Sequence, residues 1–111
     1  MRKSLFFLLS VMVLTSFSLE ARVYKGQKEY IKKCKKCHND GQELAYSKKK
    51  REWKKLMKSK GDPMAALHLE NKKASDSWKY FQSKKYTKKA KHLKDFFIEY
   101  AKDSDNVPAC D

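Results

Sequence analysis

Apolar residues recur at helical spacing along most of this chain, and no stretch of any length alternates as a β-strand does. The clearest pattern lies near the end, where one helix face carries Ala90, Leu93, Phe97, Tyr100 and Ala101, with Phe96 beside it. Thr87 is expected to cap this helix, and the polar residues 103–106 follow it. Ser75 or Asp76 is expected to cap a short aromatic helix before it. The pattern predicts an all-α protein.

An earlier helix is predicted over residues 26–36. Tyr30, Ile31 and Cys34 fall on its apolar face, and Tyr30 is interpreted as a core residue. Gly26 has no side chain and would let another helix cross closely. Residues 39–41 read Asn-Asp-Gly, which is a turn signal, and the segment from there to Ser47 is expected to be a loop.

Two more helices are predicted in the middle of the chain. Residues 49–60 place Trp53 and Met57 on one apolar face, which is interpreted as core, and Gly61 is expected to end this helix. The next helix is expected to start at Asp62–Pro63, because aspartate suits the N-cap and proline the first helical position.

The first residues have the pattern of an export signal. Arg2 and Lys3 are followed by an almost wholly apolar run over residues 5–14, and small residues come shortly before position 22. We expect a signal peptide over residues 1–21, a domain over residues 22–111 and a periplasmic location. The alternative is a permanent membrane anchor, for which the apolar run is short.

The stretch Cys34-Lys35-Lys36-Cys37-His38 is a C-x-x-C-H sequence, the attachment signature of a c-type haem. In such a site the two thiols form thioethers with the haem vinyl groups, and the histidine ligates the iron. The alternatives are half of a zinc site or a thioredoxin-like redox pair. The zinc interpretation lacks a second ligand pair close in the sequence, and the redox interpretation lacks an alternating βα pattern. Predicted export favours haem, with its one iron, because such haems are attached outside the cytoplasm.

The chain is strongly basic. It has 27 Lys and Arg residues against 13 Asp and Glu residues, a net charge of +14, and loss of residues 1–21 would lower this to +13. Nucleic acid is the usual partner of such a charge, but an exported protein rarely meets it. An acidic redox partner protein is therefore expected, with an anionic membrane surface as the alternative. A small domain buries a limited core, so covalent haem would also stabilise the fold.

Taken together, Gly26, Tyr30, the C-x-x-C-H stretch and an aromatic last helix resemble a class I monohaem cytochrome c. The tail, residues 103–110, is similar to that of small periplasmic cytochromes of epsilonproteobacteria. The resemblance implies a helical fold around one covalent haem, with the first and last helices crossing where Gly26 meets Phe97 or Tyr100. It also implies a one-electron carrier and not an enzyme.

The chain departs from this family in its second iron ligand. The family places an axial methionine shortly before the last helix, but this chain has no methionine after Met64. His68 is the expected distal ligand and Met64 the alternative, and the two lie four residues apart on one helix side. Met57 is interpreted as core and His92 as exposed. An open iron site is the remaining alternative.

Two other functions stay open at this point. The chain could be the haem-bearing subunit of a larger redox complex, such as a sulfur-oxidising or nitrate-reducing assembly. It could also be a ligand-binding or peroxidase-like haem protein, with His68 as a distal acid and base. A peroxidase-like site would need a distal arginine, and neither Arg22 nor Arg51 is close to His68 in the sequence.

The third cysteine, Cys110, has no partner if haem takes the other two. We expect an accessible thiol in the tail that forms occasional intermolecular disulfides. The alternative is a small buried residue packed on the last helix.

Overall fold

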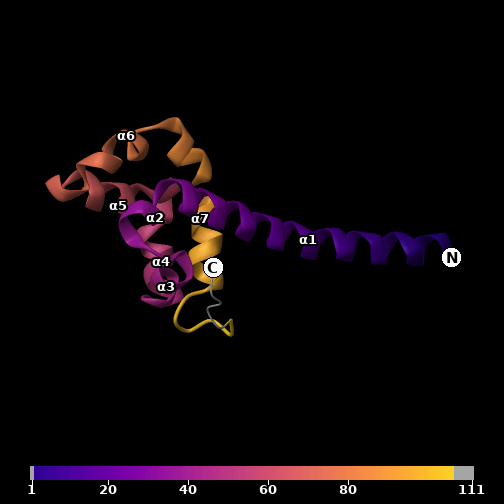
Figure 1. The fold of residues 1–111 in the computed structure, drawn as a ribbon. Coiled ribbons are helices and arrows are strands. Elements are labelled where there is room, and N and C mark those ends of the chain that lie inside the picture. Colours follow the sequence, from indigo (N-terminus) through magenta and orange to yellow (C-terminus); the bar gives the residue numbers. More distant parts are fainter. Residues whose placement is uncertain (1, 107–111) are drawn as a thin grey trace.

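The computed structural model describes residues 2–106, with side chains from residue 18 onward, and every regular element in this part is helical (Figure 1). The predicted all-α class is confirmed. The elements in chain order are α1 (Arg2–Lys33), α2 (Lys35–His38), α3 (Gly41–Tyr46), α4 (Lys50–Leu56), α5 (Lys58–Leu69), the 3-10 helix η1 (Lys72–Ser77), α6 (Trp78–Phe81) and α7 (Lys84–Glu99).

Helix α1 begins at Arg2, far before the predicted start at residue 26, and its first part projects away from the body of the protein (Figure 1). Residues 18–20 are exposed, and Val23, with 9% of its surface accessible, is the first buried residue in the part of α1 whose side chains are described. Helix α1 therefore begins to pack against the rest of the protein close to residue 21, where the signal peptide is expected to end. Cleavage at that position stays a prediction. Within the described residues, no helix is both long and apolar enough to cross a membrane.

The two long helices, α1 and α7, cross closely at Gly26. A Cβ atom added to Gly26 would lie 2.0 Å from the carbonyl oxygen of His92 and 2.8 Å from the Cβ atom of Phe96. The predicted close crossing is present, but its partners on α7 are His92 and Phe96. The expected partners, Phe97 and Tyr100, were wrong, because Phe97 turns towards other aromatic rings of the core.

Aromatic side chains fill the space beside this crossing. Tyr30 and Trp53 are each only 1% exposed, so both core interpretations are confirmed. The ring of Trp53 stacks on Phe97 with 4.3 Å between centroids, and its indole N–H donates to the carbonyl oxygen of Ala45 at 2.8 Å. The predicted buried face of α7 is confirmed for Ala90, Leu93, Phe97 and Ala101, whereas Tyr100 is only half-buried. Phe96, expected beside this face, is fully buried, and the face extends one turn further back to Tyr86.

Side-chain caps start two helical elements, α3 and η1, that the sequence pattern did not predict. The segment to Ser47, expected to be a loop, forms α3, because the Asp40 carboxylate accepts a backbone N–H at 2.9 Å and acts as its N-cap. Asn71 accepts a backbone N–H at 3.0 Å and caps η1, which precedes the predicted aromatic helix. Neither Ser75 nor Asp76 caps that helix, α6, because both lie inside η1, and the N-cap of α6 is Ser77, whose side chain forms no capping hydrogen bond. Turns and N-caps favour the same residue types, which explains why α3 was expected to be a loop.

The last helix also starts earlier than predicted. Ser83 accepts the backbone N–H of Tyr86 at 3.3 Å and caps α7, whereas the Thr87 hydroxyl donates to the carbonyl oxygen of Lys84 inside the helix. The earlier start places Tyr86 on the buried face, and this burial favours Ser83 over Thr87 as the cap.

Helix α5 contains a sharp break. Ser59, Lys60 and Gly61 have φ values of 51°, 57° and 80°, in the left-handed region. Two of these residues carry side chains, for which this conformation is unfavourable. The Tyr86 hydroxyl donates to the Gly61 carbonyl oxygen at 2.7 Å and fixes the break against α7. The predicted boundary between Gly61 and Asp62–Pro63 falls at this break.

A substitution at the helix crossing tests this packing. Alanine normally stabilises an exposed helix position relative to glycine by up to about 1 kcal/mol. Gly26→Ala should instead lower the free energy of unfolding by about 1–3 kcal/mol, because the new methyl group overlaps the His92 backbone. Urea unfolding followed by circular dichroism measures this. Lys28→Ala, at an exposed position of the same helix, is the control, and a Gly26→Ala protein as stable as that control would contradict the crossing.

Candidate functional site

The C-x-x-C-H sequence forms one tight helical turn between α1 and α3. Helix α1 ends at Lys33, not at Lys36 as predicted, and the backbone N–H groups of Cys37 and His38 both donate to the Cys34 carbonyl oxygen, at 3.1 and 3.0 Å. The turn ends at Asn39, whose φ is 64°. It therefore places three chemically active side chains within one turn.

The core fixes the end of this turn. The buried Tyr30 hydroxyl donates to the Asn39 carbonyl oxygen at 2.9 Å. The Tyr30 ring lies 6.0 Å from that of Phe96 and 6.2 Å from that of Phe97, measured between centroids. The position of the motif is thus tied to the crossing of α1 and α7.

The two cysteines have different surroundings. Cys34 is half-buried and Cys37 is exposed, and neither is in a disulfide. Burial, followed by the negative charge of Glu29 and the neighbouring Cys37, raises the pKa of the Cys34 thiol to about 12. Cys34 is therefore a neutral thiol at physiological pH, in an apolar surrounding that suits a thioether.

The fold brings two of the predicted site residues together. The rings of His38 and His68 lie 5.9 Å apart between centroids, with their planes at 78°. Partial burial, followed by the charge of His68, lowers the pKa of His38 below its usual range. A neutral imidazole is the form that binds a metal. The sequence predicted both residues, but thirty positions separate them and only the fold shows the contact.

Three contacts hold His68 in position. Its Nδ1 atom lies 2.8 Å from the Met64 carbonyl oxygen, which can only accept a hydrogen bond, so Nδ1 carries the proton. The Trp78 indole N–H donates to the His68 carbonyl oxygen at 2.6 Å, and Phe81 stacks on the ring at 4.1 Å. The free Nε2 atom keeps its lone pair, which is the arrangement common among metal-ligating histidines.

An apolar cavity adjoins the histidine pair on its inner side. It has a volume of about 40 Å³, and its lining includes Cys34, His38, Met64 and His68. Met57 also contributes to it and is only 3% exposed, so its interpretation as core is confirmed. Met64, the alternative distal ligand, thus faces the same space as His68.

An outer cavity of about 210 Å³ adjoins the same pair and opens beside Cys37. The two cavities share Cys34, His38, His68 and Phe81, so the histidine pair lies where they meet.

These residues fit a haem in kind and in spacing. A metal–imidazole bond is about 2 Å long, so two imidazoles on one metal have ring centres about 6 Å apart. The 5.9 Å observed between His38 and His68 agrees with this distance. A porphyrin is much larger than the inner cavity, so the apolar side chains around the pair would have to move apart to admit it.

The remaining candidates lie elsewhere. His92, predicted to be exposed, is half-buried at the crossing of α1 and α7, and its Nδ1 atom has no hydrogen-bond partner among the described residues. It lines neither cavity beside His38 and His68, so it is no longer an iron-ligand candidate. Cys110 lies outside the described residues. Within residues 2–106, no three His, Cys, Asp or Glu side chains converge as a metal site.

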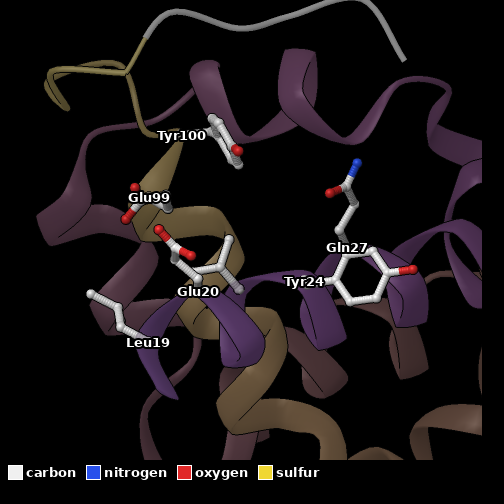
Figure 2. A pocket seen from close by; sticks show the side chains of 7 residues that line it. Leu19, Glu20, Tyr24, Gln27, Glu99 and Tyr100 are labelled. Carbon is white, nitrogen blue, oxygen red and sulfur yellow. The ribbon is translucent and has the colours of Figure 1, made fainter. Parts of the chain in front are cut away.

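A larger open groove, of about 590 Å³, lies between α1 and the end of α7 (Figure 2). Leu19, Glu20 and Tyr24 form one side of it, and Glu99 and Tyr100 the other. It contains no motif residue, and cleavage after residue 21 would remove part of one wall. Its size is therefore no guide to function.

Sequence reasoning missed the residues that support the site. Trp78 and Phe81 were assigned only to a short helix, although both hold His68. Glu29 and Tyr80 were not noticed as a pair, although the Tyr80 hydroxyl donates to the Glu29 carboxylate at 2.7 Å. The three aromatic residues of α6 were the only sequence signal, and it does not say what they face.

No protein family, curated protein or solved structure matches this chain. Its function is therefore inferred from the motif and from the geometry around it.

Proposed function

We propose that this chain is a periplasmic monohaem c-type cytochrome that carries single electrons. The proposal rests on the contact between two imidazoles. The ring centroid of His38, the histidine of the C-x-x-C-H turn, lies 5.9 Å from that of His68. His68 lies on a different helix and has a hydrogen bond that leaves Nε2 free. Two imidazoles beside two thiols and an apolar cavity are a donor set suited to covalent haem.

Each residue has a defined part in this proposal. Cys34 and Cys37 would hold the group through thioether bonds, and His38 and His68 would ligate its iron from opposite sides. Bound haem would supply an iron that gains and loses one electron. The protein would exclude water with its apolar residues and keep both imidazoles in place through the Asn39 and Met64 carbonyl oxygens. No substrate bond is made or broken.

The proposed ligand pair has consequences for the redox potential. Methionine opposite histidine raises the potential of a haem iron, so two histidines would give a lower value. Met64 remains the alternative ligand because it lines the same inner cavity. A peroxidase-like role is disfavoured, since no arginine lines either cavity among the described residues: Arg51 is exposed, and Arg22 lies 3.8 Å from Asp95.

Lysines close to the motif support docking to an acidic redox protein. Exposed lysines line a groove next to the C-x-x-C-H turn: Lys32, Lys33, Lys36, Lys79 and Lys85. None of them forms an ion pair within 4 Å among the described residues, where the only such pair joins Arg22 and Asp95. Asp76 also lines this groove, but five lysines face one carboxylate, so the groove stays positive and can attract a negatively charged partner.

Covalent haem is the first expected result. Protein produced in a host with a periplasmic maturation system should gain the mass of one haem and lose residues 1–21. Cys34→Ala combined with Cys37→Ala should abolish the added mass, whereas Cys110→Ala should keep it. Mass spectrometry of the intact protein checks all three, and a mature protein that carries zinc and no haem would end the proposal.

The distal ligand is tested by absorption spectroscopy. The oxidised protein should be low-spin and lack the weak red band that a methionine–iron bond gives. His68→Ala should turn the iron high-spin, whereas Met64→Ala should leave it low-spin, because the Met64 group bonded to His68 is a backbone carbonyl. The opposite pattern would move the assignment to Met64.

Electron transfer to a strongly acidic redox protein should slow steeply as salt rises, because the Debye length falls from about 10 Å at 0.1 M to about 3 Å at 1 M. Lys33→Gln with Lys36→Gln, next to the motif, should lower the low-salt rate more than Lys58→Gln with Lys60→Gln, in a separate groove. Stopped-flow kinetics measure both. Equal effects of the two pairs, or rates flat in salt, would mean that the lysines only solvate the surface.

A further inference from the structure

The four-residue helix α6 contacts both His68 on α5 and helix α1, which precedes the turn that carries His38. Trp78 and Phe81 hold His68, the first through its carbonyl oxygen and the second by stacking on its ring. Tyr80, between them, donates to the Glu29 carboxylate on α1 at 2.7 Å. Helix α1 leads directly into the C-x-x-C-H turn, so this hydrogen bond joins the support of His68 to the support of His38.

Glu29 is an unusual residue to find at this position. It is only 4% exposed, and among the described residues no cation lies within 4 Å of its carboxylate. A buried carboxylate is costly unless it is hydrogen-bonded. Among the described residues, Tyr80 supplies the one hydrogen bond to this buried carboxyl group, so the position of Tyr80 is fixed relative to α1.

The surroundings of Tyr80 favour this donor role. Burial, followed by the hydrogen bond to Glu29, raises the pKa of the Tyr80 hydroxyl, which therefore stays protonated. Its ring lies 5.5 Å from those of Phe81 and Tyr86, and the Lys33 Nζ atom lies 5.5 Å from its centroid. Helix α6 thus has a polar attachment to α1 and an aromatic attachment to the core.

We propose that the Glu29–Tyr80 hydrogen bond is a positioning link that keeps His68 opposite His38 and so decides whether His68 ligates the iron. The inference rests on the proposed function. If the bond is lost, only the contact of Lys33 with the Tyr80 ring still joins α6 to α1, and the two contacts of α6 with His68 fix that ring less firmly relative to the motif. Glu29 and Tyr80 are then positioning residues that act through His68 and do not touch the iron.

Substitutions can separate this role from general stability. Tyr80→Phe keeps the ring but removes the donor, and Glu29→Leu keeps the bulk but removes the acceptor. Glu29→Gln keeps an acceptor oxygen and should restore ligation. Tyr46→Phe is the control, because this tyrosine is 47% exposed and lies on α3, away from the Glu29–Tyr80 hydrogen bond and from the contacts of α6 with His68.

The readouts are the spin state of the oxidised haem-bearing protein and the rate at which added cyanide binds the iron. Tyr80→Phe and Glu29→Leu should each raise the high-spin fraction and speed cyanide binding roughly tenfold, the effect expected from one lost hydrogen bond to a charged group. Glu29→Gln and Tyr46→Phe should stay close to the unmodified protein. Haem attached in the Tyr80→Phe or Glu29→Leu variant shows that the motif still folds.

The outcomes distinguish the two claims. An unmodified chain that acquires no haem overturns the proposed function and this inference with it. A low-spin unmodified protein whose Tyr80→Phe variant stays low-spin and binds cyanide no faster overturns the positioning role alone. Equal loss in Glu29→Gln and Glu29→Leu also overturns it, because the acceptor oxygen would then be irrelevant.

Discussion

The close crossing of α1 and α7 at Gly26 is the contact on which the rest of this structure depends. With no side chain at Gly26, the His92 backbone approaches α1, and Phe96 and Phe97 reach the buried Tyr30. Tyr30 in turn holds the Asn39 carbonyl oxygen and so the end of the C-x-x-C-H turn. The position of His38 therefore follows from a helix contact more than ten residues away in the sequence.

The second half of the site depends on a different set of forces. His68 is held by neutral hydrogen bonds and by aromatic stacking, whereas α6 is attached to α1 through a buried carboxylate. Apolar contacts depend little on direction. A hydrogen bond to a buried carboxylate needs a narrow geometry, and its loss costs a large amount of free energy. This combination suits a site in which one ring must stay at a set distance from another.

Local spacing made the main site residues predictable. Cys34, Cys37 and His38 are recognisable because the motif needs only one turn of chain, and Met64 and His68 share a helix side four residues apart. The buried face of α7 also followed from its helical period. Each of these features is fixed by residues that are close neighbours in the sequence.

The features that the sequence did not reveal need contacts between distant segments. Ser83 and Thr87 are both good caps, and only the burial of Tyr86 decides between them. Asp40 suits a turn as well as an N-cap, so the sequence alone does not distinguish α3 from a loop. The link between Glu29 and Tyr80 spans 51 positions, and a glutamate on a lysine-rich helix gives no sign that it will be buried.

A crystal structure of the mature, haem-bearing protein would test the central claim most directly. We expect one haem joined to Cys34 and Cys37, with a nitrogen atom of His38 and one of His68 each about 2 Å from the iron. An iron bound by the Met64 sulfur, or with no protein ligand opposite His38, would contradict it.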